Sequence, residues 1–256
     1  MNDSQIFPNR FFTPNDTVHW LDGSSAETTD NMQRISVPLR IDLHDAPRDL
    51  GMINTLGKTA FLRRPNSALT ELTEHPSPGK TLPAQTITGT VSDPSGLYIA
   101  RKFTLQIGQG ISHSVVLYPT PLGAGFSQNG GLLGAVRQSH NQAPLPWALL
   151  TLKVWLDDDR SIVVRGQTNA QGDFSLPTHT LPALPEGKTH YNASLSLAGQ
   201  ARARSDSPLD PAGFSAFQLG ALNTPEFCNN LALNIIPGQL LMLRSYKKDH
   251  LAVQTE

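Results

Sequence analysis

The sequence predicts an all-β protein made of two antiparallel β-sandwich-like modules and an extended N-terminal arm. Apolar and polar residues alternate over many short runs, which is the period of a strand with one buried face. The chain of 256 residues contains 20 prolines and 20 glycines, a content that suits short strands joined by turns. We assign residues 1–34 to the arm, 35–125 to an N-terminal β-domain, and 126–256 to a β-sandwich with a long loop and a C-terminal hairpin.

The predicted arm is polar and shows no apolar periodicity, so it cannot form a core alone. Isolated apolar residues within it are our candidates for partner-binding anchors: Phe7, Phe11, Phe12, Trp20 and Leu21. In this interpretation the anchors bury their side chains in a neighbouring subunit while the backbone pairs with that neighbour's sheet edge.

The N-terminal β-domain is expected to begin with a strand at residues 35–43, where the odd positions are apolar. Pro38 places this strand at a sheet edge, because proline cannot donate to a ladder. Residues 92–96 read SDPSG and predict a turn. Further strands are expected at residues 86–91, 98–107 and 114–118, and a loop with one helical turn at residues 63–80.

The C-terminal module has the clearest strand pattern. Residues 152–156 and 162–165 alternate in hydrophobicity, and the polar residues 157–161 between them predict a hairpin loop. A second hairpin turn is expected at residues 169–172, with Gly172 at positive φ. Phe174 and Leu176 restart the alternation and should face the core.

The same segment resembles a known family. Gly134, the run PLPWA at residues 144–148, and the run GQTNAQGDFSL at residues 166–176 are similar to the pattern of carboxypeptidase-regulatory-like (transthyretin-like) domains. The resemblance implies a β-sandwich that serves as an accessory or structural module more often than as a catalytic one.

The remainder of this module should contain a strand at residues 189–198 and a loop at 199–226. Pro237 and Gly238 suit the centre of a type II turn, so residues 231–236 and 240–243 are predicted to form the final hairpin. Residues 246–256 are charged and expected to be peripheral.

No pattern of catalytic or ligand-binding residues is present, and we predict that the protein is not an enzyme. The formal charge of −1, without a basic stripe, argues against nucleic acid as a partner. The eight histidines lack the spacing of a metal site, and the acidic triplet at residues 157–159 lacks the spaced ligands of a calcium loop. We therefore predict no catalytic residues, no metal and no cofactor; a metal-dependent hydrolase built from scattered histidines and aspartates is the third-ranked alternative.

The lone Cys228 excludes an intrachain disulfide. Residues 1–8 lack the basic and apolar regions of a signal peptide, and no run approaches the ~18 apolar residues of a membrane span. These features predict synthesis in the cytoplasm and no membrane span, and are compatible with a place in a released, virion-like particle.

The sequence favours a structural or adaptor subunit of a multiprotein assembly, whose partners are other protein subunits or further copies of itself. Residues 113–176 also resemble accessory β-proteins of phage-tail-like contractile injection particles, which implies a place at a baseplate, fibre or cap. The alternative is a carbohydrate-binding or substrate-presenting module, with Trp147 or Trp155 as the stacking platform. Trp155 should point away from the face shared by Leu152, Val154 and Leu156, either into solvent or against the other domain.

Overall fold

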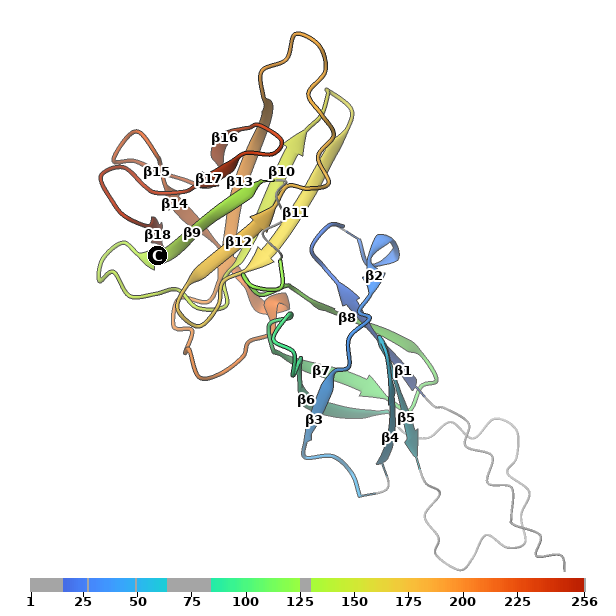
Figure 1. Cartoon of the computed structure of the whole chain (residues 1–256). Coiled ribbons are helices and arrows are strands. Elements are labelled where there is room, and N and C mark those ends of the chain that lie inside the picture. Colours follow the sequence, from blue (N-terminus) through green and yellow to red (C-terminus); the bar gives the residue numbers. More distant parts are fainter. Residues whose placement is uncertain (1–15, 27, 49, 64–83, 125–129, 256) are drawn as a thin grey trace, which may run out of the picture.

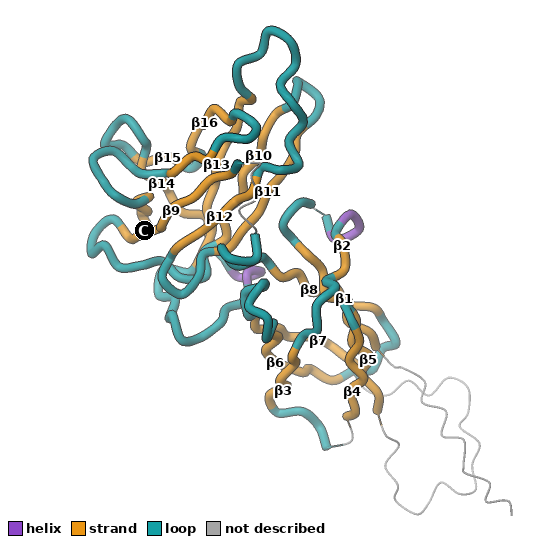
Figure 2. Tube along the Cα trace, in the orientation of Figure 1, coloured by secondary structure: helices purple, strands orange, loops and turns teal. Residues whose placement is uncertain are grey.

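The computed structural model describes residues 16–26, 28–48, 50–63, 84–124 and 130–255. The described chain is all-β, with two 3-10 turns, η1 (Thr29–Asn31) and η2 (Pro211–Gly213), as its helical elements. Figures 1 and 2 show the strands gathered in an N-terminal module (β1 to β8) and a C-terminal module (β9 to β18). Each module encloses its own apolar core. The predicted all-β, sandwich-like fold is confirmed.

The N-terminal module packs two sheets against each other. One sheet has the order β2-β1-β5-β4, with β8 on the other side of β1, and the second has the order β3-β6-β7. The strand bounds are β1 Asp16–Asp22, β2 Gln33–Arg34, β3 Arg40–His44, β4 Leu50–Thr55, β5 Lys58–Arg63, β6 Gln85–Ser92, β7 Arg101–Ile107 and β8 Ser112–Leu117. The β1–β8 pair is parallel, whereas the sequence predicted an antiparallel module.

The assignment of residues 1–34 to an arm is wrong in its second half. Residues 16–22 form β1 inside the first sheet, and Trp20 and Leu21 are buried in the core. The Trp20 indole Nε1–H donates to Thr59 Oγ1 at 2.8 Å, and its ring meets Phe103 edge to face at 5.5 Å. Trp20 and Leu21 are therefore core residues and not partner-binding anchors. The alternation in β1 is too short to be distinctive, and its partners β5 and β8 come much later in the chain.

Phe7, Phe11 and Phe12, the other predicted anchors, lie outside the described residues. Most of the predicted loop at residues 63–80, with its helical turn, also lies outside them. The turn at residues 92–96 is confirmed, with Gly96 at φ 74°. The strands expected near residues 86–91, 98–107 and 114–118 appear as β6, β7 and β8, and the first predicted strand is shortened to β3.

The C-terminal module is a sandwich whose two sheets are joined through one strand. The first sheet contains β11-β10-β13, with β16 and β14 along the far side of β13; the second contains β12-β9, with β17 and β18 along the far side of β9. Strand β18 pairs with both β14 and β9 and so links the sheets. The strand bounds are β9 Gly131–Gln138, β10 Leu149–Trp155, β11 Ser161–Gln167, β12 Asp173–Pro177, β13 Tyr191–Gly199, β14 Ser215–Gly220, β15 Phe227–Cys228, β16 Leu231–Ile235, β17 Leu240–Met242 and β18 Leu251–Gln254.

Two predicted hairpins have the right turns but the wrong partners. Gly172 lies at φ 82°, and Phe174 and Leu176 are buried as expected, but β12 pairs with β9 rather than with β11. Gly238 also lies at φ 82°, yet β16 pairs with β13 while β17 runs parallel to β9. Turn residues specify that the chain reverses direction, whereas packing decides which strand the next segment pairs with. Here both turns lead from one sheet of the sandwich to the other, on the opposite side of the core.

The residues at the C-terminal end of the described chain are not peripheral, contrary to the expectation for residues 246–256. Leu251, Ala252 and Val253 in β18 are fully buried. Their short run escapes recognition because the flanking residues are polar or charged.

The loop between β13 and β14 reaches from the C-terminal module onto the N-terminal one. Its Asp210 forms a salt bridge of 2.7 Å with Arg101 in β7, and the Lys102 N–H donates to Leu209 O at 3.3 Å. On another side, the Arg165 N–H in β11 donates to Ser24 O at 2.6 Å. These contacts fix the two modules against each other.

Candidate functional site

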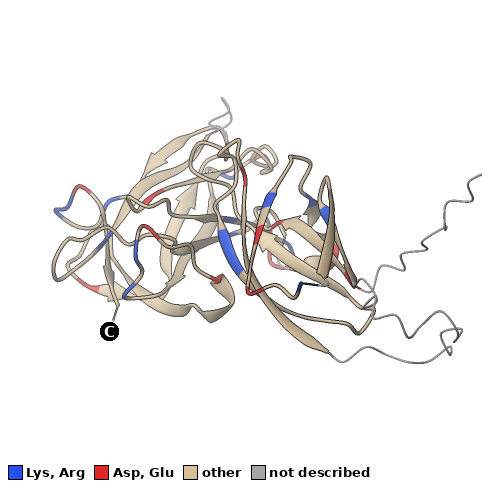
Figure 3. Cartoon of the chain, turned by 90° about the horizontal axis from the view of Figure 1, so that it is seen from below, with Lys and Arg blue, Asp and Glu red and all other residues tan. Residues whose placement is uncertain are grey.

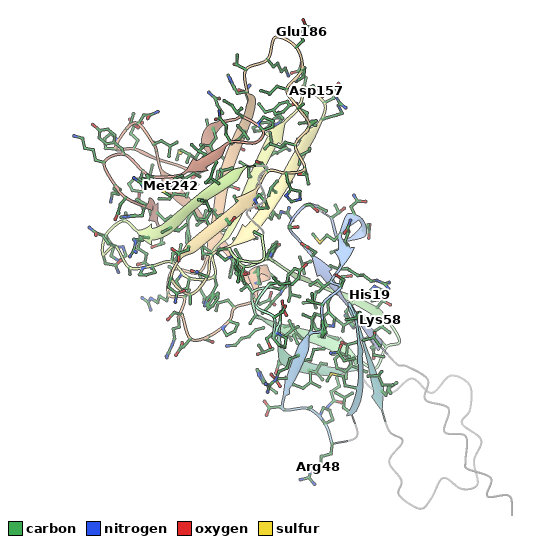
Figure 4. All side chains as sticks on the ribbon, in the orientation of Figure 1. His19, Arg48, Lys58, Asp157, Glu186 and Met242 are labelled. Carbon is green, nitrogen blue, oxygen red and sulfur yellow. The ribbon has the colours of Figure 1, made fainter. Side chains whose placement is uncertain are left out.

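A cavity of about 300 Å³ lies at one end of the C-terminal module. We call it the tip pocket, and its lining residues come from the β10–β11 loop and the segment that leads into β13. Figure 1 shows these two segments at the same end of the module. Asp157 and Glu186, labelled in Figure 4, mark the two loops at this end. The residues that line the tip pocket are Trp155, Asp157, Asp158, Gly187, Lys188, Thr189, His190, Tyr191 and Asn192.

Strand register places Trp155 in a polar row across four strands. Trp155 pairs with Ser161 on β11 and with Asn192 on β13, and Asn192 pairs with Asn234 on β16. Residues directly opposite each other on neighbouring strands share a face of the sheet. Trp155 points away from the buried face, as the alternation predicted, and its side chain is 38% exposed. The other three residues of this row are exposed too.

One wall of the pocket is the hairpin loop that the sequence predicted. The Asp157 carboxylate accepts hydrogen bonds from the Arg160 N–H at 2.8 Å and the Asp159 N–H at 3.2 Å, and it forms a salt bridge with the Arg160 guanidinium at 2.5 Å. The hydrogen bond from the Arg160 side chain lowers the pKa of Asp157 below its ordinary value. Asp157 is therefore an ionised, internally bonded residue that holds the loop, while Asp158 is exposed.

The opposite wall is tied to the first by one lysine. Lys188 Nζ donates to Leu156 O at 3.0 Å and lies 5.9 Å from the centre of the Tyr191 ring. The Tyr191 hydroxyl donates in turn to Ala183 O at 3.0 Å, and Tyr191 is buried. Lys188 and Tyr191 thus shape the pocket, and Trp155 and Asn192 are among its exposed residues.

Trp147 lies at a different place. It precedes β10, whereas Trp155 ends it, so the two are separated by the length of that strand, ~20 Å. Trp147 adopts φ 62°, is half-buried, and donates its indole N–H to Arg204 O at 2.8 Å. It anchors the β13–β14 loop, and only Trp155 belongs to the tip pocket.

Two edge strands expose large apolar side chains, a feature that sequence reasoning missed. In β4, Ile53 is 54% exposed and Met52 is also exposed; in β17, Leu240 is 60% and Met242 54% exposed. Within the described ranges, β4 pairs only with β5 and β17 only with β9. An alternation pattern assigns apolar side chains to a core, so it gives no signal for apolar residues that stay outside.

Other features of the described residues are less distinctive. A second cavity of about 340 Å³ lies between the modules. In its lining, the Tyr98 hydroxyl donates a hydrogen bond to the Asp22 carboxylate at 2.8 Å. Burial is the largest cause that raises the pKa of Tyr98, and this hydrogen bond is the second. Burial also raises the pKa of the half-buried Cys228 thiol. Figure 3 shows basic and acidic residues interspersed over both modules.

The described residues contain no group of three or more histidine, cysteine, aspartate or glutamate side chains that could hold a metal ion. No helix in the same ranges is long and apolar enough to cross a membrane.

No protein-family model and no curated protein matches the sequence. A comparison with solved structures gives a likeness to "Structure of the Streptococcal ancillary pilin", with 11% identity and a TM-score of 0.21, over 94% of this chain and 62% of the pilin chain. The chain therefore spans less than two thirds of that protein's length. A TM-score this low is too small to indicate a common fold.

Proposed function

We propose that the protein is a non-enzymatic structural or adaptor subunit of a multiprotein assembly, made in the cytoplasm. The observation that carries the proposal is the exposure of large apolar side chains on two sheet edges, β4 and β17. Edge strands of soluble proteins are normally protected by charged residues, proline or a covering segment. Neither β4 (LGMINT) nor β17 (LLM) contains a charged residue or a proline.

Apolar edges that lack charged residues and proline suit a protein that is covered by neighbours. A strand from another subunit can pair with the free backbone groups of an edge, and the exposed side chains then become buried in the contact. Residues 1–15 contain Phe7, Phe11 and Phe12, and their sequence suits an extended segment that supplies such a strand to a neighbour. The partners are then other subunits, including further copies of this chain.

The more specific form of the proposal is a component of a phage-tail-like contractile particle. It is supported by the resemblance of residues 113–176 to accessory β-proteins of such particles and by that of residues 166–176 to carboxypeptidase-regulatory-like domains, which serve mainly as structural modules.

The test uses the full chain, tagged and expressed in the cells that produce it. In one variant the β17 edge carries charge, with Leu240→Lys and Met242→Lys; the matched control is Leu122→Lys, at an exposed leucine outside any strand. A second variant lacks residues 1–15. We expect the parent and the control to sediment with a high-mass complex, and both altered proteins to sediment alone while keeping the parent's circular dichroism spectrum.

The assembly role is refuted if the parent itself sediments alone in native extracts. Normal incorporation of the β17 variant would show that this edge faces solvent in the complex, and normal incorporation of the truncated chain would show that residues 1–15 do not hold the subunit.

A further inference from the structure

The tip pocket combines an exposed indole with the amide side chain of Asn192, and this combination is independent of the sheet edges discussed above. Trp155 is 38% exposed and lines the cavity with its large aromatic side chain. Neighbouring strands lie ~4.8 Å apart, so the Asn192 amide stands next to the indole and the Asn234 amide one strand further along the same row. Each amide can both donate and accept hydrogen bonds.

These groups define the chemistry of a complementary ligand. The indole requires a flat apolar surface, and the Asn192 amide requires groups that both donate and accept hydrogen bonds. The Ser161 hydroxyl and the Asn234 amide lie in the same row of the sheet, beside the lining of the pocket. A pyranose ring has both properties, because one face presents C–H groups and its edge presents hydroxyls. The volume of about 300 Å³ is at the lower end of the range for small-molecule sites, which suits one or two sugar rings.

The pocket is less suited to two other ligand classes. Asp158 opposes an anion, Asp157 is already paired with Arg160, and Lys188, the lysine of the pocket, already donates to Leu156 O. A quaternary ammonium ion would require a cage of several aromatic faces. The second aromatic residue of the pocket, Tyr191, is buried and lies beside Lys188, so no such cage forms here.

We propose that the tip pocket is a binding site for a neutral saccharide, with Trp155 stacking on one sugar ring and Asn192 binding its hydroxyls. The site does not depend on the proposed assembly role, because it lies at the end of the module formed by loops and strand ends, away from the edge of β17 (Figure 4). Sugar binding there would give an assembled particle, or the free protein, a contact with a glycan-covered surface.

The experiment begins with an array of neutral and acidic oligosaccharides probed with the full-length protein at high concentration. The strongest neutral binder is then titrated by isothermal calorimetry against the parent and three variants. Trp155→Ala removes the platform, Asn192→Ala removes the nearest amide, and Thr151→Ala is the control, since Thr151 lies on the same face of β10 two rows away.

We expect Trp155→Ala to weaken binding about tenfold or more, as is common for a central tryptophan in a contact. Asn192→Ala should weaken it by a smaller factor, and Thr151→Ala should leave it unchanged. All three positions are exposed or half-exposed on the sheet surface, so the variants should keep the parent's thermal unfolding. Absence of any neutral binder, stronger binding of acidic glycans, or undiminished binding by Trp155→Ala would each overturn the proposal.

Discussion

Replacing Phe174 tests the packing of the C-terminal module most directly. Its ring is 1% exposed and lies against Gly134, its partner on β9, where an added Cβ would come within 2.8 Å of a ring carbon. Burial of ~200 Å² by an aromatic side chain, at ~25 cal/mol per Å², is worth ~5 kcal/mol. Because alanine retains part of this area, we expect Phe174→Ala to lower the free energy of unfolding by about 3–5 kcal/mol.

The assay is urea unfolding of the full chain followed by circular dichroism, with Asp173→Ala as the control. Asp173 is exposed on the same strand, so its replacement should change stability by only ~0.5 kcal/mol. A double-mutant cycle with Gly134→Ala checks the contact between the two residues. The added Cβ clashes with the Phe174 ring, so Gly134→Ala should destabilise the Phe174→Ala variant less than it destabilises the parent. If Phe174→Ala unfolds at the same urea concentration as the parent, the packing described for β12 is wrong; a strictly additive cycle would contradict the contact with Gly134.

Two further predictions concern the N-terminal module. Asp93 accepts hydrogen bonds from the Ser95 N–H at 2.8 Å and the Leu97 N–H at 2.9 Å, so Asp93→Ala should destabilise this module by ~1–3 kcal/mol in denaturant titrations, and an unchanged midpoint would contradict the role of this turn. Burial, followed by the charges of Arg34 and Lys58, lowers the pKa of His19. The unfolded chain therefore binds more protons, so the contribution of His19 is present above its unfolded pKa of about 6.5 and decreases at lower pH. His19→Gln should make the loss of stability below this pH shallower, and equal slopes for the two proteins would refute the assignment.

The turns and core positions of the C-terminal module could be predicted because local signals agree there. The positive φ of Gly172 and the burial of Phe174 follow from turn chemistry and from alternation in a single stretch of sequence. The same stretch contains no information on whether β12 joins β11 or β9, because that choice depends on packing between residues far apart in the chain. The placement of Trp20 failed for the same reason, since its partners Thr59 and Phe103 lie far along the chain.

The candidate site was predictable only in part. Alternation along β10 correctly placed the Trp155 side chain on the outer face. Its neighbours Asn192 and Asn234 come from β13 and β16, and their positions depend on the register between strands. Two asparagines in separate strands carry no motif, so sequence reasoning could not bring them beside the indole.

The pairing of β18 bears on how the protein folds as it leaves the ribosome. β9 is the first strand of the C-terminal module to emerge, but Leu251 and Val253, which pair with Val136 and Gln138 along one of its edges, emerge almost a whole module later. Until then this edge of β9 is open, and contacts between such distant residues form slowly. A nascent chain with an open, apolar edge is prone to aggregate. A pause in synthesis before β18, or a truncation that removes residues 251–254, should therefore harm the yield of folded protein more than the few residues involved would suggest.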